Sequence, residues 1–556
     1  MAGRRPNMWD SLAPVDKQRA EEYVAAGWWR SETFLDDLAV AARDRPDHPA
    51  IITYEGGEHA RTLTYAELAT MVARFAGALR SLGVGRGDVV MIYLPNRWVL
   101  TPLYLACNQI GAVSSPGFPM LSTRELRQVL ESTGARVCIT LDTFAGTDYA
   151  ARLAELDVPT LEHRVVIGDA ARVGAIDFQE VFVDTPWEER FPDDGRDALG
   201  PDEPALVLHT SGTTGPMKGV VHSQNTMYAC VRASAEPLGL APDEVVLLPS
   251  VLTHMAGVTH AVYLPVHLGC TAVVMDSGDD MALMVALIAR HGGTFVYAAP
   301  GFVIGMLAAQ RRTPVQTPTL RQIVSGSAPI APQLIADVRE AFGVPMRALW
   351  GMTENGAVTV TRLDDPDDWA AHSDGRPVPW MQVRIDTDPG EEAGRLYARG
   401  ASQCLGYLNQ RDLYESLLDD DGWFDTGDLA RDDGRGGIRI TGRRVDLITR
   451  ANSLRVSTLD IEAVLQRHPH VVEAVLVGYP DPAVPGADLV CAVVVPGGGD
   501  TPTLAGLHDY LEAEGVARVL WPDRLQFVRI LPKNALGKPL RHPLRQRLEI
   551  AASARS

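Results

Sequence analysis

A loop with the side chains of a phosphate site lies between a strand-like run and a helix-like run. Residues 208–219 hold four hydroxyl side chains, three glycines and one lysine. Glycines let backbone N–H groups turn toward an anion, hydroxyls add donors, and Lys218 supplies positive charge. The loop is not a Walker A motif, because Lys218 follows Met217 and precedes Gly219. Taken alone, this composition is also compatible with a flexible turn, so the phosphate hypothesis depends on the rest of the chain.

A hydroxyl and a carboxylate follow another strand-like run, at Thr353 and Glu354. A carboxylate beside a triphosphate acts mainly through Mg²⁺, because the ion offsets the repulsion between the two anions. Trp350, three residues earlier, offers an aromatic face on which a nucleobase can stack. The alternatives are a surface acid for Glu354 and a core side chain for Trp350.

Three further groups could complete a nucleotide site. Asp428 ends a Thr-Gly-Asp turn, and Arg443 follows about one strand later. An aspartate suits the two hydroxyls of a ribose, and an arginine suits those hydroxyls or a phosphate. Lys538 follows a glycine in a predicted loop near the C-terminus. Each signal is weak singly, since such turns are common and most lysines are solvated surface charges.

The elements that must position these groups alternate between strands and helices. A capping box at Thr64 and Glu67 predicts a helix that ends at Gly83, and residues 223–235 predict another. Short apolar runs at 88–94, 205–208, 245–248, 271–275, 294–298, 322–324 and 347–350 predict strands. This rhythm indicates doubly wound parallel sheets covered by helices, with ligands at the carboxyl ends of the strands.

The pattern changes twice toward the C-terminus. From about residue 385 the strands shorten and glycines punctuate them, which predicts a small β-rich subdomain over about 385–442. A separate α/β unit follows, with a helix at 457–466 and strands at 473–478 and 489–495. We therefore predict an α/β protein with an N-terminal domain at 1–442 and a small C-terminal domain at 443–556.

Composition restricts the function classes. A chain of 556 residues with 46% hydrophobic content can bury several cores. Its formal charge of −19 disfavours binding to nucleic acid or an anionic membrane. No secretory signal and no apolar run of bilayer length is evident, and the six cysteines lack metal-ligand spacing. We expect a cytoplasmic protein with reduced thiols and without a membrane span.

The order and spacing of these groups together resemble the AMP-forming acyl-CoA synthetase family, part of the adenylate-forming (ANL) superfamily that includes luciferases and peptide-synthetase adenylation domains. The resemblance covers roughly residues 30–545, and the stretches at 325–330 and 375–377 support it. The pattern is most similar to ligases that join CoA to medium-chain, aryl or alicyclic acids.

The resemblance implies a two-step reaction. A carboxylate attacks the α-phosphorus of ATP and releases pyrophosphate, and a thiol then displaces AMP. Thr353 would contact the α-phosphate and Glu354 would hold Mg²⁺. Lys538 would stabilise the charge that builds during the attack, on a C-terminal domain that rotates between the two steps. His254 would be the fourth catalytic residue.

The resemblance also assigns the nucleotide and acyl contacts. The nucleotide residues are Thr210, Ser211, Gly212, Thr213, Thr214 and Lys218 at the phosphates, Ser325, Gly326, Ser327, Ala328, Pro329, Trp350, Gly351 and Met352 at the adenine, and Asp428 and Arg443 at the ribose. The acyl pocket residues are His254, Ala256, Tyr297, Gly326, Asn355, Gly356, Ala357 and Val358. A histidine or tyrosine at such places can instead be a hydrogen-bonded core residue.

Two departures from the family lie where the thioester step is built. The hinge position, commonly Lys or Asp, is Val445, and the glycine pair beyond it is replaced by Ala451 and Asn452. The leading hypothesis is an ATP-dependent carboxylate:CoA ligase. A second keeps adenylation but passes the acyl group to a carrier-protein thiol, an amine or nitrite. A third is a nucleotide-binding descendant without catalysis, which the complete set of charged residues disfavours.

The acid substrate is read from the predicted pocket. No basic residue stands out that would pair with a second carboxylate, which favours a monocarboxylic acid. Ala256 is small and leaves room for a ring or a medium chain.

Overall fold

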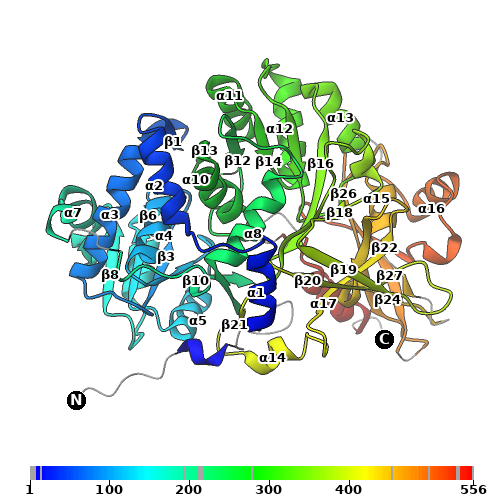
Figure 1. The fold of residues 1–556 in the computed structure, drawn as a ribbon. Coiled ribbons are helices and arrows are strands. Elements are labelled where there is room, and N and C mark those ends of the chain that lie inside the picture. Colours follow the sequence, from blue (N-terminus) through cyan, green and yellow to red (C-terminus); the bar gives the residue numbers. More distant parts are fainter. Residues whose placement is uncertain are drawn as a thin grey trace.

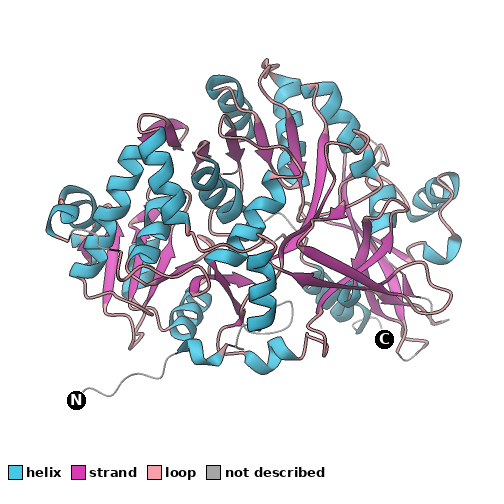
Figure 2. Cartoon of the chain, viewed as in Figure 1, coloured by secondary structure: helices cyan, strands magenta, loops and turns pink. Residues whose placement is uncertain are grey.

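The structure is a computed structural model, and it describes residues 8–12, 16–191, 195–210, 217–276, 278, 280–451, 455–456, 458–484, 486–498, 501–533 and 539–553. The chain forms two large sheets, a four-stranded sheet and a C-terminal unit, and the strands of the two large sheets are interleaved along the sequence (Figures 1 and 2). Among the described helices, none has the length and apolar character needed to cross a bilayer.

The first large sheet has nine strands, and its centre is parallel. In spatial order the strands are β18 (Arg376–Pro377), β17 (Gly356–Val360), β16 (Met346–Met352), β15 (Gln322–Ser325), β14 (Phe295–Tyr297), β12 (Val245–Leu248), β13 (Thr271–Met275), β1 (Pro49–Glu55) and β2 (Glu58–Thr64). From β16 through β1 the strands run parallel, whereas β2, β17 and β18 add antiparallel pairs at the two ends. The carboxyl ends of β14, β15 and β16 therefore lie side by side.

The second large sheet has eight strands. In spatial order they are β21 (Gly406–Tyr407), β11 (Lys218–Ser223), β10 (Pro204–Thr210), β4 (Val113–Pro116), β3 (Val89–Tyr93), β5 (Val137–Leu141), β8 (His163–Ile167) and β9 (Ile176–Asp177). Parallel pairing runs from β10 to β9, while β11 and β21 are antiparallel additions at one edge.

Helices fill the space between and around the two sheets. α3 (Tyr65–Ser81), α4 (Leu100–Gln109) and α8 (Gln224–Ala235) share one apolar core with residues of both sheets, and α8 lies at the centre of Figure 1. The predicted capping box is present, because the Thr64 hydroxyl accepts the Glu67 N–H and the Glu67 carboxylate accepts the Thr64 N–H. The remaining longer helices are α1 (Lys17–Ala25), α2 (Phe34–Asp44), α5 (Thr123–Thr133), α6 (Tyr149–Ala154), α11 (Met281–His291), α12 (Pro300–Arg312) and α13 (Pro332–Phe342).

The predicted β-rich subdomain is a four-stranded antiparallel sheet. Its strands are β19 (Met381–Asp386), β20 (Gly394–Gly400), β22 (Phe424–Asp432) and β23 (Ile438–Arg443). The predicted Thr-Gly-Asp turn is instead part of β22, where Gly427 has a φ of 73°. A glycine adopts this left-handed conformation without the steric cost of a Cβ, so the strand continues through it.

The C-terminal unit is a three-stranded sheet with helices on both faces. Its elements are β24 (Ile448–Thr449), β25 (Arg455–Val456), α15 (Leu459–Leu465), β26 (Val471–Pro480), β27 (Asp488–Pro496), α16 (Leu504–Ala513), β28 (Arg524–Phe527) and α17 (Arg541–Ser553). Along β26, Ala474 and Leu476 pack with α15 and α16, whereas Val475 and Val477 pack with α17. Successive side chains of a strand point to opposite faces, which explains an apolar run buried on both sides.

One predicted connection differs in the structure. The sequence indicated a strand, a loop and then a helix around the phosphate loop, but Lys218 begins β11. β10 and β11 form an antiparallel hairpin in which Thr210 lies opposite Lys218. The apolar residues of β11 were too few to separate a short strand from the start of α8 by periodicity.

Candidate active site

Thr353 and Glu354 lie in the tight turn between β16 and β17, at the strand end where the sequence placed them. The Thr353 carbonyl accepts a hydrogen bond from His222 Nε2 at 2.7 Å. Because a carbonyl can only accept, Nε2 carries the imidazole proton. Burial lowers the pKa of His222 to about 4, so the ring is neutral at physiological pH. A neutral, fully buried imidazole therefore fixes the backbone of the turn.

The carboxylate of Glu354 is held by a tyrosine. Tyr407 Oη donates to Glu354 Oε1 at 2.7 Å, and Lys218 Nζ donates to Tyr407 Oη at 3.4 Å. The side chain of Met352, at the end of β16, packs against the apolar cluster that contains Tyr407. The phosphate-loop lysine and the turn carboxylate, which are distant in sequence, are thus joined through one phenol.

Asp428, Arg443 and Trp350 form a second polar group. Asp428 lies directly opposite Arg443 in the register of β22 and β23, and their side chains pair at 3.0 Å. Trp350 Nε1 donates to the other Asp428 oxygen at 3.0 Å. Cross-strand partners have Cβ atoms about 4.5–5.5 Å apart, so the register itself brings the two charges together. The Asp428 carboxylate is buried and fixed at both oxygens.

The loop after β15 closes on Tyr297 at the end of β14. Gly326 has no room for a side chain, because a Cβ there would lie 2.3 Å from the Leu349 carbonyl and 2.8 Å from Tyr297 Oη. Ser327 has a φ of 68°, a conformation that costs a non-glycine residue about 1–3 kcal/mol and is enriched at functional sites. This loop therefore lies against β16, the strand that leads to the turn with Glu354.

His260 connects Tyr297 with Ala256. Its ring stacks on the Tyr297 ring with centroids 4.2 Å apart, and its Nδ1 donates to the Ala256 carbonyl at 2.8 Å. Ser234 Oγ lies 2.8 Å from the other ring nitrogen. Burial lowers the pKa of His260 to about 4. The ring is neutral, and both of its nitrogens have partners within the protein.

His254 lies at the start of the helical segment that carries Ala256 and His260. It caps α9 (Met255–Gly257), which continues as the π-helical η4 (Val258–Tyr263) and then α10 (Leu264–Leu268). π-helical turns are rare and frequently occur at functional sites. His254 Nδ1 accepts the Ala256 N–H at 3.3 Å, and burial lowers the pKa of His254 to about 4. This histidine is also neutral.

The other predicted pocket residues follow Glu354 along the chain. Gly356, Ala357 and Val358 are buried in β17. Asn355 is fully buried, and neither its side-chain nitrogen nor its side-chain oxygen has a hydrogen-bond partner among the described residues. A buried unpaired amide is costly, which marks Asn355 as a group that needs water or a ligand.

The remaining predicted nucleotide residues flank these groups. Thr210 ends β10, Gly351 lies in β16, and Ala328 and Pro329 lie in the loop after β15. Ser211, Gly212, Thr213, Thr214 and Lys538 lie outside the described residues, as does Asn452 next to the predicted hinge.

The turn fits the way proteins bind Mg²⁺. This ion usually takes one or two carboxylates and completes its shell with phosphate oxygens and water. Glu354 supplies one buried carboxylate beside the hydroxyl of Thr353, and only Oε1 is engaged by Tyr407. Among the described residues no group of three or more His, Cys, Asp or Glu could hold a metal alone. The residues therefore suit a metal that arrives with a nucleotide.

Three positioning residues were missed by sequence reasoning: His222, His260 and Tyr407. Each is buried and lies far along the chain from its partner in the site. The only signal for His222 was its place after two valines between the glycine-rich loop and a predicted helix, and for Tyr407 a tyrosine beside Gly406. Neither signal separates a site residue from an ordinary core residue.

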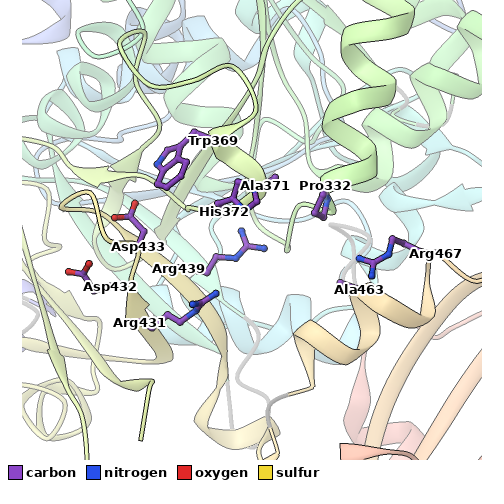
Figure 3. Close-up of a pocket in the computed structure, with 10 residues that line it drawn as sticks. All are labelled: Pro332, Trp369, Ala371, His372, Arg431, Asp432, Asp433, Arg439, Ala463 and Arg467. Carbon is purple, nitrogen blue, oxygen red and sulfur yellow. The ribbon is translucent and has the colours of Figure 1, made fainter. Parts of the chain in front are cut away.

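A separate cavity of about 400 Å³ lies between the C-terminal unit and the large domain (Figure 3). Arg467, just after α15, lines it from the C-terminal side, and Arg431, Arg439 and Trp369 line it from the other side. Among the described residues that line this cavity, none is one that the sequence assigned to the nucleotide or the acid.

Comparison with known proteins identifies the class. The family model described as AMP-binding enzyme matches residues 38–408, and the model described as AMP-binding enzyme C-terminal domain matches residues 460–538. The chain belongs to this family, within the adenylate-forming ANL superfamily. It is an adenylate-forming ligase whose substrates are a carboxylic acid and ATP.

Its relatives include ligases with different acceptors. The chain is 31% identical to the salicyl-AMP ligase / salicyl-S-ArCP synthetase of Mycobacterium tuberculosis, over 99% of this chain and 97% of that protein. It is 29% identical to the medium-chain fatty-acid–CoA ligase of Escherichia coli, over 98% and 95%. The apo structure of Mycobacterium smegmatis MbtA is 30% identical with a TM-score of 0.71, covering 98% of this chain and 100% of that chain.

A further solved structure is similar in fold. The anthranilate CoA ligase AuaEII in complex with anthranoyl-AMP has a TM-score of 0.83 at 24% identity, covering 94% of this chain and 98% of that chain.

Proposed function

We propose that the protein is an AMP-forming ligase that joins a monocarboxylic acid of the aryl, alicyclic or medium-chain type to CoA. The observation that carries the proposal is the contrast between the charged turn around Glu354 and the neutral groups around Tyr297. The first suits Mg·ATP, and the second suits an apolar acyl group. His254 and His260 are neutral, so neither supplies a cation for a second carboxylate.

The candidate site residues have the following roles in this proposal. Lys218 neutralises the β- and γ-phosphates, Thr353 contacts the α-phosphate, and Glu354 holds Mg²⁺, which supplies charge neutralisation at the phosphates when it is bound. Asp428 and Arg443 bind the ribose, and the loop at 325–329 and Trp350 line the adenine. The two anions must meet in line, so fixed positive charge and positioning are the main contributions of the protein.

The C-terminal domain supplies the remaining charge. We propose that it begins at residue 443 and moves as a unit that carries Lys538 to the reacting carboxylate. Val445, at the proposed hinge, is 67% exposed, so little of its side chain would have to leave packed surroundings during such a motion. A rotation of this domain after adenylation would move Lys538 away from the adenylate and let the thiol approach it.

The second candidate acceptor is a carrier-protein thiol. The similarity to the salicyl-AMP ligase / salicyl-S-ArCP synthetase favours it, and so does a hinge that departs from the family at Val445 and Ala451. The same adenylate would then be transferred to a pantetheine arm instead of free CoA. Amines and nitrite remain further acceptors to test.

The test is pyrophosphate release by the purified protein with ATP, Mg²⁺ and a panel of aryl, alicyclic and medium-chain acids, each with and without CoA. Multiple turnovers that require CoA would support the CoA ligase hypothesis, and the acids that give them would identify the substrate class. A single stoichiometric release that CoA does not extend assigns the acceptor to a carrier protein, an amine or nitrite. Lys538→Ala should lower the adenylation rate by about 10²–10³-fold. Activity that survives this substitution would overturn the assignment.

A further inference from the structure

Strand register places Tyr407 on the same face as the phosphate-loop lysine. Tyr407 in β21 lies opposite Val220 in β11, and Lys218 is two residues before Val220. Residues two apart on a strand point to the same face, and a diagonal neighbour is within reach of a long side chain. The Lys218 ammonium accordingly lies 4.9 Å from the Tyr407 ring centroid and 3.4 Å from its hydroxyl.

The segment that carries Tyr407 also holds Glu354, at two separate atoms. The backbone carbonyl of Glu354 accepts the Cys404 N–H at 2.7 Å, and its carboxylate accepts the Tyr407 hydroxyl at 2.7 Å. The side chains of Glu354 and Tyr407 are both buried, with 6% and 1% of their surfaces exposed. Both the backbone and the carboxylate of the turn are therefore set by residues 404–407.

The phenol separates two opposite charges. Its single proton is donated to Glu354, and its oxygen accepts from Lys218. A phenol has an ordinary pKa of about 10, so it has a proton to donate at physiological pH. Without the hydroxyl, the flexible ammonium of Lys218 could reach the buried carboxylate directly. Such an ion pair would occupy the two groups that the nucleotide and its metal need.

We propose that Tyr407 is a positioning residue for Mg·ATP: its hydroxyl keeps Lys218 and Glu354 apart and orients Glu354 so that one carboxylate oxygen remains open. The inference rests on the proposed function, in which Lys218 binds phosphate and Glu354 binds the metal. Lys218 and Glu354 would then already be in position when Mg·ATP binds. The hydrogen bond from Tyr407 to Glu354 would remain, while the Lys218 side chain would turn toward the phosphates.

The experiment measures binding, separately from turnover. The affinity of the purified full-length protein for α,β-methylene-ATP is measured by calorimetry with Mg²⁺ and with EDTA. In Tyr407→Phe the affinity in Mg²⁺ should fall by about 10-fold, because a hydrogen bond to a charged group is lost and Lys218 pairs with Glu354. The concentration of Mg²⁺ that gives half-maximal adenylation should rise in parallel, while the KM for the acid stays unchanged.

Tyr414→Phe is the matched control. The Tyr414 ring packs edge-on to Tyr407 with centroids 5.3 Å apart, and its hydroxyl donates to the Cys404 carbonyl at 3.1 Å. It is buried in the same cluster, and its hydroxyl bonds with Gln403 and Cys404 instead of Lys218 or the Glu354 carboxylate. If Tyr407→Phe acts only by loosening the packing of this apolar cluster, Tyr414→Phe should weaken nucleotide binding as well. We expect its Mg²⁺ dependence to match the wild type.

A double-mutant cycle with Glu354→Gln completes the test. If Tyr407 acts through Glu354, Tyr407→Phe should have no further effect on Mg²⁺-dependent binding in the Glu354→Gln background. Equal affinities of wild type and Tyr407→Phe in Mg²⁺ would overturn the inference alone. A wild type that binds the analogue equally well with Mg²⁺ and with EDTA would instead overturn the metal role of Glu354 in the proposed function.

Discussion

The two sides of the candidate site are built from opposite kinds of chemistry. On the nucleotide side, Lys218, Glu354, Asp428 and Arg443 carry charge, and each is held by a hydrogen bond or ion pair. On the acyl side, His254, His260 and Tyr297 are buried polar residues that the surrounding protein keeps neutral.

Under the proposed function, the difference would let the protein bind a polyanion and an apolar acid through separate groups of residues. Charged groups placed in advance bind phosphates without further reorganisation. If the acyl group binds beside Tyr297 as proposed, the neutral side chains there would leave a second carboxylate without a partner, which disfavours dicarboxylic acids. Substitutions on one side should therefore change one substrate and leave the other unaffected, and the predictions below test this separation.

Among substitutions of the described residues on these two sides, the largest effect is expected for Glu354→Gln. The substitution keeps the shape of the side chain but removes the charge proposed to hold Mg²⁺, so adenylation should fall by about 10²-fold. The KM for the acid should change little. Pyrophosphate release at varied Mg²⁺ measures the effect, and the exposed Glu392→Gln is the control. Full activity in Glu354→Gln would show that the carboxylate of Glu354 is not needed to hold Mg²⁺.

Asp428→Ala should act next most strongly, by raising the KM for ATP about 10-fold or more. It removes an acceptor for ribose hydroxyls and leaves Arg443 and the Trp350 N–H without their shared partner. Asp432→Ala, at the end of the same strand and exposed, is the matched control. An acid KM that rises as much as the ATP KM would contradict the separation of the two sides.

On the acyl side, Ala256→Trp should reduce kcat/KM for aryl acids by about 10-fold, because an indole fills space that a ring would occupy. The affinity for ATP should stay within about 2-fold of the wild type. Rates on benzoate-like and octanoate-like acids test the size of the pocket. Ile304→Trp, an exposed position on α12, controls for added bulk. Equal rates on every acid would exclude Ala256 from the pocket wall.

The last prediction concerns stability instead of activity, and it is a dependence of unfolding on pH. The pKa of His209, His222, His254 and His260 is about 4 in the fold, against 6.5 for an ordinary histidine. The unfolded chain therefore binds protons between pH 6.5 and 4 that the folded chain does not. Stability from these groups is complete above pH 6.5 and is lost as the pH falls toward 4, by up to about 1.4 kcal/mol per pH unit for each histidine.

Urea unfolding at pH 7, 6 and 5 measures this slope. His260→Gln should reduce the slope over that range, whereas the exposed His59→Gln should leave it unchanged. Equal slopes in wild type and His260→Gln would show that His260 takes up protons equally in the folded and the unfolded chain over this pH range.

Much of the architecture followed from local pattern. Seven apolar runs in the large domain became strands, and the capping box at Thr64 began a helix as expected. The errors were local as well. β11 was missed because six residues between a glycine-rich loop and a helix give little periodicity, and Asp428 was placed after a turn because Gly427 disguised a continuous strand.

The sequence by itself determined which chemistry is present. A lysine at 218, a carboxylate at 354 and an Asp-Arg pair at 428 and 443 have the types and spacing that a metal-nucleotide requires, and these depend on residue identity along the chain. Only the tertiary structure decided which buried neutral residues contact the predicted site residues. Tyr407 reaches Glu354 because β21 joins the edge of β11, and His260 reaches Tyr297 because a π-helical turn packs on β14. Such contacts join residues whose separation along the chain carries no periodic signal, so packing alone reveals them.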